Sequence, residues 1–219
     1  MEAAYTQDKL IVGSGYIIPK VEGSVQKVSL SANEKSDFGS IVVEGKSIPL
    51  LVDNFNGNTI RVSSNNMVRD ITKQEHTAWG LVWEQGLDNQ YLITQGMNET
   101  KDMPATGIYT YKGSAVQFTG VGSTIDVNSA ERRDDAEFKA DFIHKTFAGI
   151  IPQKDINAPI ILAGEIKNNT FAGESSEGVK TKGGFFGAEA SELIGDYIRT
   201  DKDKLVIGVF GAKKQPKEF

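Results

Sequence analysis

The sequence predicts a mainly β protein whose C-terminal half folds as a closed antiparallel barrel. Runs rich in Val, Ile, Thr and aromatic residues recur at hairpin-like spacing from residue 105 onward. Isolated glycines interrupt several of these runs, as they do where strands bend or approach each other closely. Hardly any segment has helical periodicity. Barrel closure is the natural way for such a meander to remove its exposed strand edges.

The first part of the chain predicts short strands separated by turns. Residues 9–18 form a β-branched run broken by Gly13 and Gly15, which we interpret as a strand with a bulge. The glycines lack the full dinucleotide-loop spacing, and no helix-forming run follows them. Further strands are expected at residues 21–30, 41–43, 48–52 and 59–63.

Residues 65–83 contain the only plausible helix of the first half and both tryptophans. Met67, Val68 and Ile71 have near-helical spacing, so residues 65–74 are expected to be helical. Residues 75–83 then read as a strand with Trp79 and Trp83 on one face. Another strand is expected at 91–94, and the polar segment 95–104 ends in proline, which places a domain boundary there.

The second half predicts a continuous series of hairpins. Strands are expected at 106–116, 117–128, 136–142, 147–151, 158–166, 170–173 and 205–214. Phe138, Ala140 and Phe142 alternate with charged residues, so one face of their strand is expected to be buried. In residues 180–197, Phe185 and Phe186 should face opposite sides of the wall, and residues 188–193 should make a connecting turn.

Composition excludes several classes of function. The formal net charge of −5 argues against a nucleic-acid partner, and no apolar run reaches the length of a membrane helix, about 18 residues. The chain has no cysteine, so it has neither disulfides nor a thiol nucleophile. Neither histidine lies in a nucleophile motif, and no phosphate-binding loop or EF-hand is present, so we expect no enzyme activity. Residues 1–10 are too polar for a signal peptide, so an exported protein should have lost its signal.

Five short segments, in order over about half of the chain, resemble one family of bacterial surface proteins. Residues 103–214 are similar to the C-terminal β-barrel of transferrin-binding-protein-B-like proteins of Gram-negative bacteria. The resemblance implies an N-terminal β-rich handle domain, residues 1–102, followed by an eight-stranded antiparallel β-barrel domain, residues 103–219. It also implies export to the cell surface or medium by an outer-membrane translocator. The segments are Met103–Gly107 with Tyr109–Gly113, Ala140–Phe142, Gly183–Gly187, Ala190–Gly195 and Val209–Lys214.

The size of the chain and its lack of cysteine make the hemophilin-type secreted haem carriers the most similar subgroup. That resemblance implies a monomer that captures haem and delivers it to an outer-membrane receptor, possibly after contact with haemoglobin. Histidine is the commonest axial ligand of haem iron, and only His76 and His144 can supply it. The expected haem wall is therefore His76, Trp79, Met67 and Arg69, with His144 as a second metal ligand. His76 could also act alone, with the other axial position empty or filled by Met67, Met97 or a tyrosine.

Two other functions remain open at this point. The chain could be a cofactor-free surface module that recognises a host protein, such as haemoglobin or a complement regulator, through its handle loops. A lipocalin-like carrier is less favoured, because small barrels are normally filled by their own side chains and Phe138, Phe142, Phe147 and Phe185 should point inward. The structural alternative for the proposed haem wall is that His76 and the tryptophans belong to the handle's own core.

Overall fold

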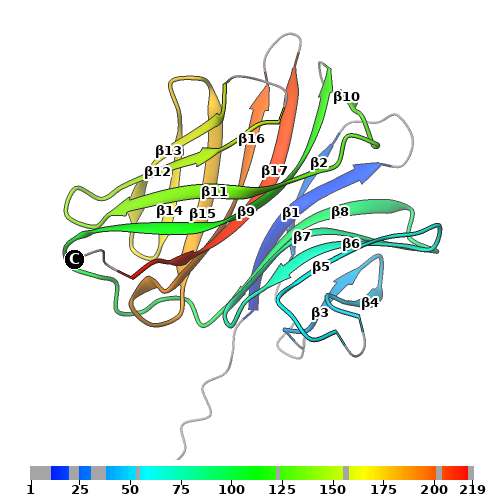
Figure 1. The fold of residues 1–219 in the computed structure, drawn as a ribbon, viewed down its shortest axis with the longest axis horizontal. Helices are drawn as coiled ribbons and strands as arrows, with labels where there is room; N and C mark the ends of the chain where they lie inside the picture. The colour runs from blue at the N-terminus through cyan, green and yellow to red at the C-terminus, as the bar shows by residue number, and fades with distance from the viewer. Residues whose placement is uncertain are drawn as a thin grey trace, which may run out of the picture.

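The structure is a computed structural model, which describes residues 11–19, 25–30, 38–52, 55–121, 124–154, 158–200 and 204–216. In these residues the chain consists of β-strands and one 3₁₀ turn, with no α-helix, which confirms the mainly β prediction. A handle sheet and a barrel pack against each other (Figure 1). Within this described part, no helix could cross a membrane.

The handle contains a six-stranded antiparallel sheet in the order β2-β1-β8-β7-β6-β5, together with a hairpin formed by β3 and β4. Phe38, Ile41 and Ile48 belong to or flank the hairpin and pack with Ile71 and Ile93 of the sheet, so the hairpin covers one face of it. The strands are β1 (Ile11–Pro19), β2 (Gln26–Leu30), β3 (Ser40–Val43), β4 (Lys46–Pro49), β5 (Thr59–Ser63), β6 (Met67–Lys73), β7 (Thr77–Glu84) and β8 (Asn89–Met97).

The barrel is closed and has eight principal antiparallel strands, as predicted. Strand β17 pairs with both β16 and β9, which closes the sheet, and the two-residue strand β10 extends it beside β9. The strands are β9 (Ile108–Val121), β10 (Thr124–Ile125), β11 (Glu131–Asp141), β12 (Thr146–Ile151), β13 (Ile160–Lys167), β14 (Thr170–Glu174), β15 (Val179–Phe186), β16 (Glu192–Thr200) and β17 (Leu205–Lys214).

Aromatic side chains fill the barrel interior at the end nearest the turn between β11 and β12. The rings of Phe147 and Phe171 stack with centroids 3.9 Å apart, and those of Phe138 and Phe210 with centroids 4.7 Å apart. Phe138, Phe142, Phe147 and Phe185 all lie in this buried cluster, as the sequence predicts. Phe185 and Phe186 do face opposite sides of the wall, since Phe186 packs between barrel and handle. The 3₁₀ turn Ala188–Ala190 then leads into β16.

Two expectations for the handle are wrong. Residues 67–73, expected to be helical, form β6, which is paired on one side with β5 and on the other with β7. The expected bulge in the first strand is absent, since β1 and β8 pair without a register shift. Gly15 serves a close approach instead, because a Cβ atom there would lie 2.0 Å from the carbonyl oxygen of Leu92. Residues 9, 10 and 21–24 of the first two expected strands lie outside the described residues.

Candidate functional site

The handle and the barrel share one apolar core at their junction. Tyr16 and Trp79 from the handle pack in a single buried cluster with Phe118, Phe186 and Val209 from the barrel. The indole of Trp79 lies directly over the backbone of Gly211, where a Cβ atom would be 2.3 Å from Cε3 of the ring. This close fit fixes the handle sheet against the wall formed by β9, β16 and β17.

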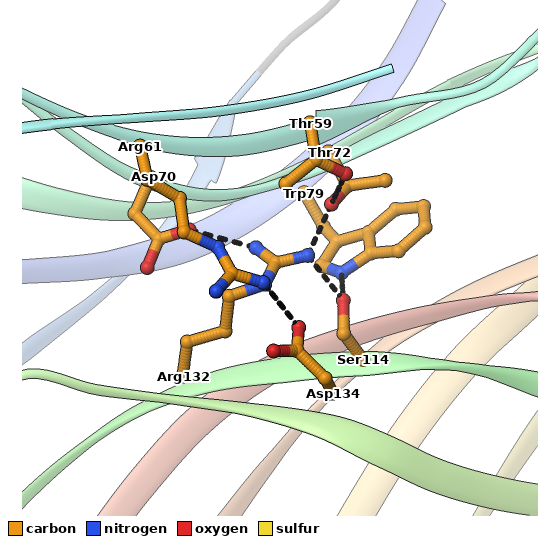
Figure 2. Close-up of polar contacts among 8 residues, drawn as sticks. All are labelled: Thr59, Arg61, Asp70, Thr72, Trp79, Ser114, Arg132 and Asp134. Carbon is orange, nitrogen blue, oxygen red and sulfur yellow. Dashed lines mark hydrogen bonds and ion pairs between the residues drawn. The ribbon is translucent and has the colours of Figure 1, made fainter. Parts of the chain in front are cut away.

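A polar network next to this core is centred on Arg132 (Figure 2). The guanidinium of Arg132, on the barrel strand β11, donates to Asp70 Oδ1 of the handle at 2.7 Å and to Asp134 Oδ1 at 2.8 Å. It also donates to Ser114 Oγ at 2.6 Å and to the hydroxyl of Thr72. Only 6% of the Arg132 side chain is exposed. One buried cation therefore joins β6 of the handle to β9 and β11 of the barrel.

Further contacts extend this network. Trp79 Nε1 donates to the same Ser114 Oγ at 3.1 Å, and Arg61 Nη2 contacts Asp134 Oδ1 at 2.5 Å. Burial raises the pKa of the Asp70 carboxyl above its usual range, although Arg132 acts in the opposite direction. The guanidinium groups of Arg132 and, to a smaller extent, Arg61 thus favour the charged form of Asp70 against desolvation.

Two buried carboxylates of β16, Asp196 and Glu192, also connect the barrel to the handle through hydrogen bonds. Asp196 accepts hydrogen bonds from Tyr16 Oη at 3.1 Å, Ser14 Oγ at 3.1 Å and Lys27 Nζ at 2.7 Å. Burial, together with the neighbouring Asp196, raises the pKa of the Tyr16 hydroxyl well above its ordinary value. Every donor in this group comes from the handle, so Asp196 is a second polar connection across the junction.

Glu192 makes the third connection, close to His76. Its Oε2 accepts from the backbone N–H of His76 at 3.1 Å and from Thr77 Oγ1 at 2.7 Å. Buried charges are normally retained only when hydrogen-bonded in this way. Three separate ionic groups and one apolar core therefore fix the orientation of the handle, which makes the handle–barrel unit a preorganised scaffold.

A cleft of about 1240 Å³ lies at one edge of this junction. The His76 ring forms part of its wall, with Nδ1 3.2 Å from Asn98 Nδ2. Gly187 has a φ of +74°, and a Cβ atom there would lie 2.4 Å from Cδ2 of His76, so glycine is required beside the ring. The cleft is lined by His76, Asn98, Glu99, Thr100, Lys101, Asp102, Met103, Lys145, Ile166, Asn168, Asn169, Gly187, Ala188 and Glu189.

The two histidines have different environments. The side chain of His76 is 16% exposed in the wall of the cleft. The side chain of His144 is 74% exposed at the tip of the β11–β12 turn, with Nδ1 2.7 Å from Asp141 Oδ2, and it is not among the cleft residues. Nothing in the geometry brings the two imidazoles to a common site.

The remaining residues of the expected haem wall are occupied elsewhere. Trp79 is buried in the junction core. Arg69 is 2% exposed and donates to Pro49 O at 3.1 Å, to Trp83 O at 2.6 Å and to Glu84 Oε2 at 2.5 Å. Met67 is half-buried at the start of β6 and pairs in register with Glu84. The structure therefore does not gather these side chains around one cavity with His76.

Sequence reasoning missed the residues that join the two parts of the molecule, namely Arg132, Asp70, Glu192 and Asp196. Arg132 and Asp134 fall in a segment that the pattern left outside any strand. Each of these residues is paired with a partner far away along the chain, so no local spacing marks the contact. The one available signal was the unusual placement of charged residues inside apolar strand segments, as for Asp196 between Gly195 and Tyr197.

Comparison with known proteins identifies relatives of the chain. Residues 103–214 match the family model for the C-lobe and N-lobe β-barrels of transferrin-binding protein B. The chain is 24% identical over 249 aligned residues to transferrin-binding protein B of Haemophilus influenzae, and the match covers 85% of this chain and 40% of that protein. It is 29% identical over 139 residues to the Moraxella catarrhalis protein of the same name, covering 52% of this chain and 19% of that protein. The chain thus spans less than half the length of these relatives.

Solved structures share the fold. A mutant of transferrin-binding protein B from Haemophilus parasuis Hp5 superposes with a TM-score of 0.71 at 24% identity, over 95% of this chain and 46% of that one. HpuA from Kingella denitrificans, in complex with human haemoglobin, superposes with a TM-score of 0.55 at 10% identity, over 98% of this chain and 90% of that one. At these identities the likeness shows the fold alone.

The expectation of a haem cofactor is wrong. The relatives are described as binding transferrin or haemoglobin, which are host proteins. Among the described residues, no group of three or more His, Asp or Glu side chains could hold a metal ion. Most residues that line the cleft beside His76 have polar or charged side chains, and none apart from His76 is aromatic, unlike the aromatic-walled slot that a porphyrin needs.

Proposed function

The chain belongs to the transferrin-binding protein B family, and on that premise we propose that it is a cofactor-free binding module for a host iron-carrying protein of the transferrin or haemoglobin class. The module serves bacterial iron acquisition and is a binding protein rather than an enzyme. Its expected location, secreted or on the bacterial outer surface, agrees with this family. Residues 1–102 form the handle domain that contacts the host protein, and residues 103–219 form the barrel domain that supports it.

The observation that carries the proposal is the agreement of the sequence match with the fold. The family match covers the barrel, and the complete handle-and-barrel arrangement superposes on a haemoglobin-bound protein over 98% of this chain. Neither fact identifies the host protein, so transferrin and haemoglobin are both candidates. A complement regulator is the further candidate that the sequence suggests.

The outer side of the handle offers an apolar contact surface. Val42 in β3 is 49% exposed, and Phe55, between β4 and β5, is 36% exposed. Val42 belongs to the β3–β4 hairpin, which covers the face of the handle sheet that points away from the barrel (Figure 1), and Phe55 follows that hairpin in the chain. Exposed apolar and aromatic side chains on a rigid support are typical anchors of protein–protein interfaces. The connections through Arg132, Glu192 and Asp196 supply that rigid support.

A direct binding measurement tests the proposal. The immobilised chain is exposed to human haemoglobin, transferrin and a complement regulator at concentrations up to about 10 µM, near the weak end of specific recognition. Val42→Asp and Phe55→Ser should each weaken binding at least about tenfold, which corresponds to about 1.4 kcal/mol. The matched control is Ile150→Asp, since Ile150 is 50% exposed on the barrel strand β12. Absence of binding to every host protein, or an equal loss in the control, would overturn the proposal.

The absence of a cofactor is tested separately by adding hemin to the purified chain. We expect no saturable Soret change that depends on His76. A stoichiometric Soret band that is lost in His76→Ala would contradict the cofactor-free reading, whatever the result with the host proteins.

A further inference from the structure

The side chains inside the barrel change from apolar to polar at the end opposite the β11–β12 turn. Ala115 belongs to the buried interior cluster, and Arg133 is its direct cross-strand partner in β11. Directly opposed residues of a sheet point to the same face, so the Arg133 side chain points into the barrel. Glu131 pairs in the same manner with Gln117, which is fully buried. The apolar filling therefore gives way to a polar layer that contains an arginine.

Arg133 has hydrogen-bonding capacity that its surroundings do not use. Only 7% of the residue is exposed, and its Nη2 contacts Glu131 Oε2. Its Nε and Nη1 have no hydrogen-bond partner in the described chain. These two nitrogens carry three of the five N–H donors of a guanidinium. Leaving buried donors of a charged group unpaired is unfavourable, so this position is suited to a ligand that accepts hydrogen bonds.

The neighbouring polar side chains satisfy one another rather than Arg133. Tyr197 Oη donates to Gln117 Oε1 at 2.7 Å, and Gln117 Nε2 donates to Gln153 Oε1 at 2.7 Å. Burial raises the pKa of the Tyr197 hydroxyl, and the positive charge of Arg133 partly opposes this effect. The layer thus keeps a neutral, hydrogen-bonded wall of Tyr197, Gln117 and Gln153 beside a cation that retains free donors.

A second arginine lies on the same inner face, nearer to the barrel mouth. Arg199 in β16 is the cross-strand partner of Val179 and Val206, and both of these valines belong to the interior cluster. Tyr197, two residues earlier in the strand, also belongs to that cluster. Among the described residues, Arg133, Arg199 and Glu131 are thus the charged groups placed on this inner face.

We propose that this end of the barrel binds a small oxyanion, either a carboxylate or a phosphate, on the guanidinium of Arg133. Guanidinium N–H groups form short, charge-assisted hydrogen bonds to carboxylate and phosphate oxygens. The positive charge of Arg133 attracts the anion, and Tyr197, Gln117 and Gln153, which bind one another, leave the Arg133 donors free for it. The site is on the opposite side of the barrel wall from the Arg132 network, and it is independent of host-protein binding.

Arginine side-chain NMR tests this proposal directly. The ¹⁵N-labelled chain is titrated with inorganic phosphate and, separately, with acetate, at constant ionic strength maintained with chloride. One Nε–H signal should shift in a saturable way, and it should be identified as Arg133 by its absence from Arg133→Lys. The two titrations distinguish phosphate from carboxylate. The anion that the site prefers should saturate the shift at a concentration at least about tenfold lower than the other, equivalent to 1.4 kcal/mol.

Two variants control the measurement. Arg61→Gln is the matched control, since Arg61 is 53% exposed and contacts Asp134 outside the barrel, and the saturable shift should persist in it. Anion binding should also raise the melting temperature of the wild-type chain, and Arg133→Gln should abolish that rise. If no arginine signal of the wild-type chain saturates, if all shift together, or if the thermal effect persists in Arg133→Gln, the proposal is wrong. If the Arg133 variants fail to fold, the saturating signal of the wild-type chain is assigned through its bonds to the backbone resonances of residue 133, and assignment to any other arginine would overturn the proposal.

Discussion

Arg132 and Arg133 are consecutive residues of β11, yet their guanidinium groups lie on opposite sides of the barrel wall. Arg132 points outward, where Asp70, Asp134, Thr72 and Ser114 occupy its donors. Arg133 points inward, and two of its nitrogens have no partner in the described chain. A register shift follows immediately, between Arg133 and Ala136. The same residue type thus joins two parts of the molecule at one position and leaves donors free at the next.

Removal of Arg132 should destabilise the junction. Arg132→Ala leaves the partly buried Asp70 without its cation, and breaking such a pair lowers the free energy of unfolding by about 3 kcal/mol. Urea denaturation measures the change. Arg61→Ala is the control, because the Arg61–Asp134 pair is about half exposed on both sides, and exposed pairs contribute about 0–1 kcal/mol. Equal effects of the two substitutions would show that Arg132 is not a structural connection.

Tyr16 should contribute more to the second connection than Lys27 does. The Tyr16 hydroxyl is buried and donates to Asp196, so Tyr16→Phe should lower the free energy of unfolding by about 1.5–3 kcal/mol, as expected for hydrogen bonds to charged groups. Lys27 is 42% exposed, and Lys27→Met should have an effect below about 1 kcal/mol. Chemical denaturation of the two variants gives the comparison, and the reverse order would refute this account of Asp196.

Glu44 should make handle stability depend on pH in the acidic range. Burial acts to raise its pKa, but hydrogen bonds from the backbone N–H of Asp88, from Tyr91 Oη and from Asn89 outweigh this and lower it below 4.5. A lowered carboxyl pKa stabilises the folded state above the unfolded pKa, and the stabilisation disappears as the pH falls through the folded pKa.

The difference in melting temperature between the wild type and Glu44→Gln should therefore be greatest near pH 7 and shrink below pH 4.5. Thermal denaturation over this pH range provides the measurement. Glu165→Gln is a suitable comparison, because Glu165 is 74% exposed and contacts only the exposed Lys167 among its ionic neighbours in the described chain. A difference that grows toward low pH would contradict the argument.

Trp79 and Gly211 should behave as a coupled pair. Gly211→Ala places a methyl group against the indole and should destabilise the chain by about 1–3 kcal/mol. Trp79→Leu removes the ring that the methyl group would meet, so the double variant should be more stable than the sum of the single effects predicts. A double-mutant cycle measures this coupling, which is expected to be about 0.5–3 kcal/mol. Strict additivity would mean that the close contact has no energetic consequence.

The sequence predicts the barrel better than the handle, for a physical reason. Barrel strands such as β11 have one buried and one exposed face, so Phe138 and Ala140 alternate with charged residues. Strand β6 lies between two apolar layers, with Ile71 in the hairpin-side core and Val68 against the barrel-side core. A strand buried on both faces loses its alternation, and the spacing of Met67, Val68 and Ile71 then imitates a helix.

The candidate site was less predictable than the fold. His76 was chosen for the aromatic and basic residues near it in the sequence, but in a strand those neighbours point in different directions. Trp79 faces the barrel, and Arg69 is bound to Pro49 and Trp83 within the handle. The residues that do meet the His76 ring are Asn98, from a connecting segment, and Gly187, from a barrel turn. Their meeting depends on the packing of two sheets, which no local pattern encodes.

The pairing of β17 with β9 also imposes an order on folding. Strands β10 to β16 lie between these two in the sequence, so the barrel cannot close until β17 is available. Leu205, Ile207 and Val209 of β17 are part of the surface on which the handle rests. The handle strands, although they come first in the chain, therefore gain their complete docking surface only after the last barrel strand is in place. Such long-range pairing is slow to form, and until then the apolar side of the handle sheet is open to aggregation or to a chaperone.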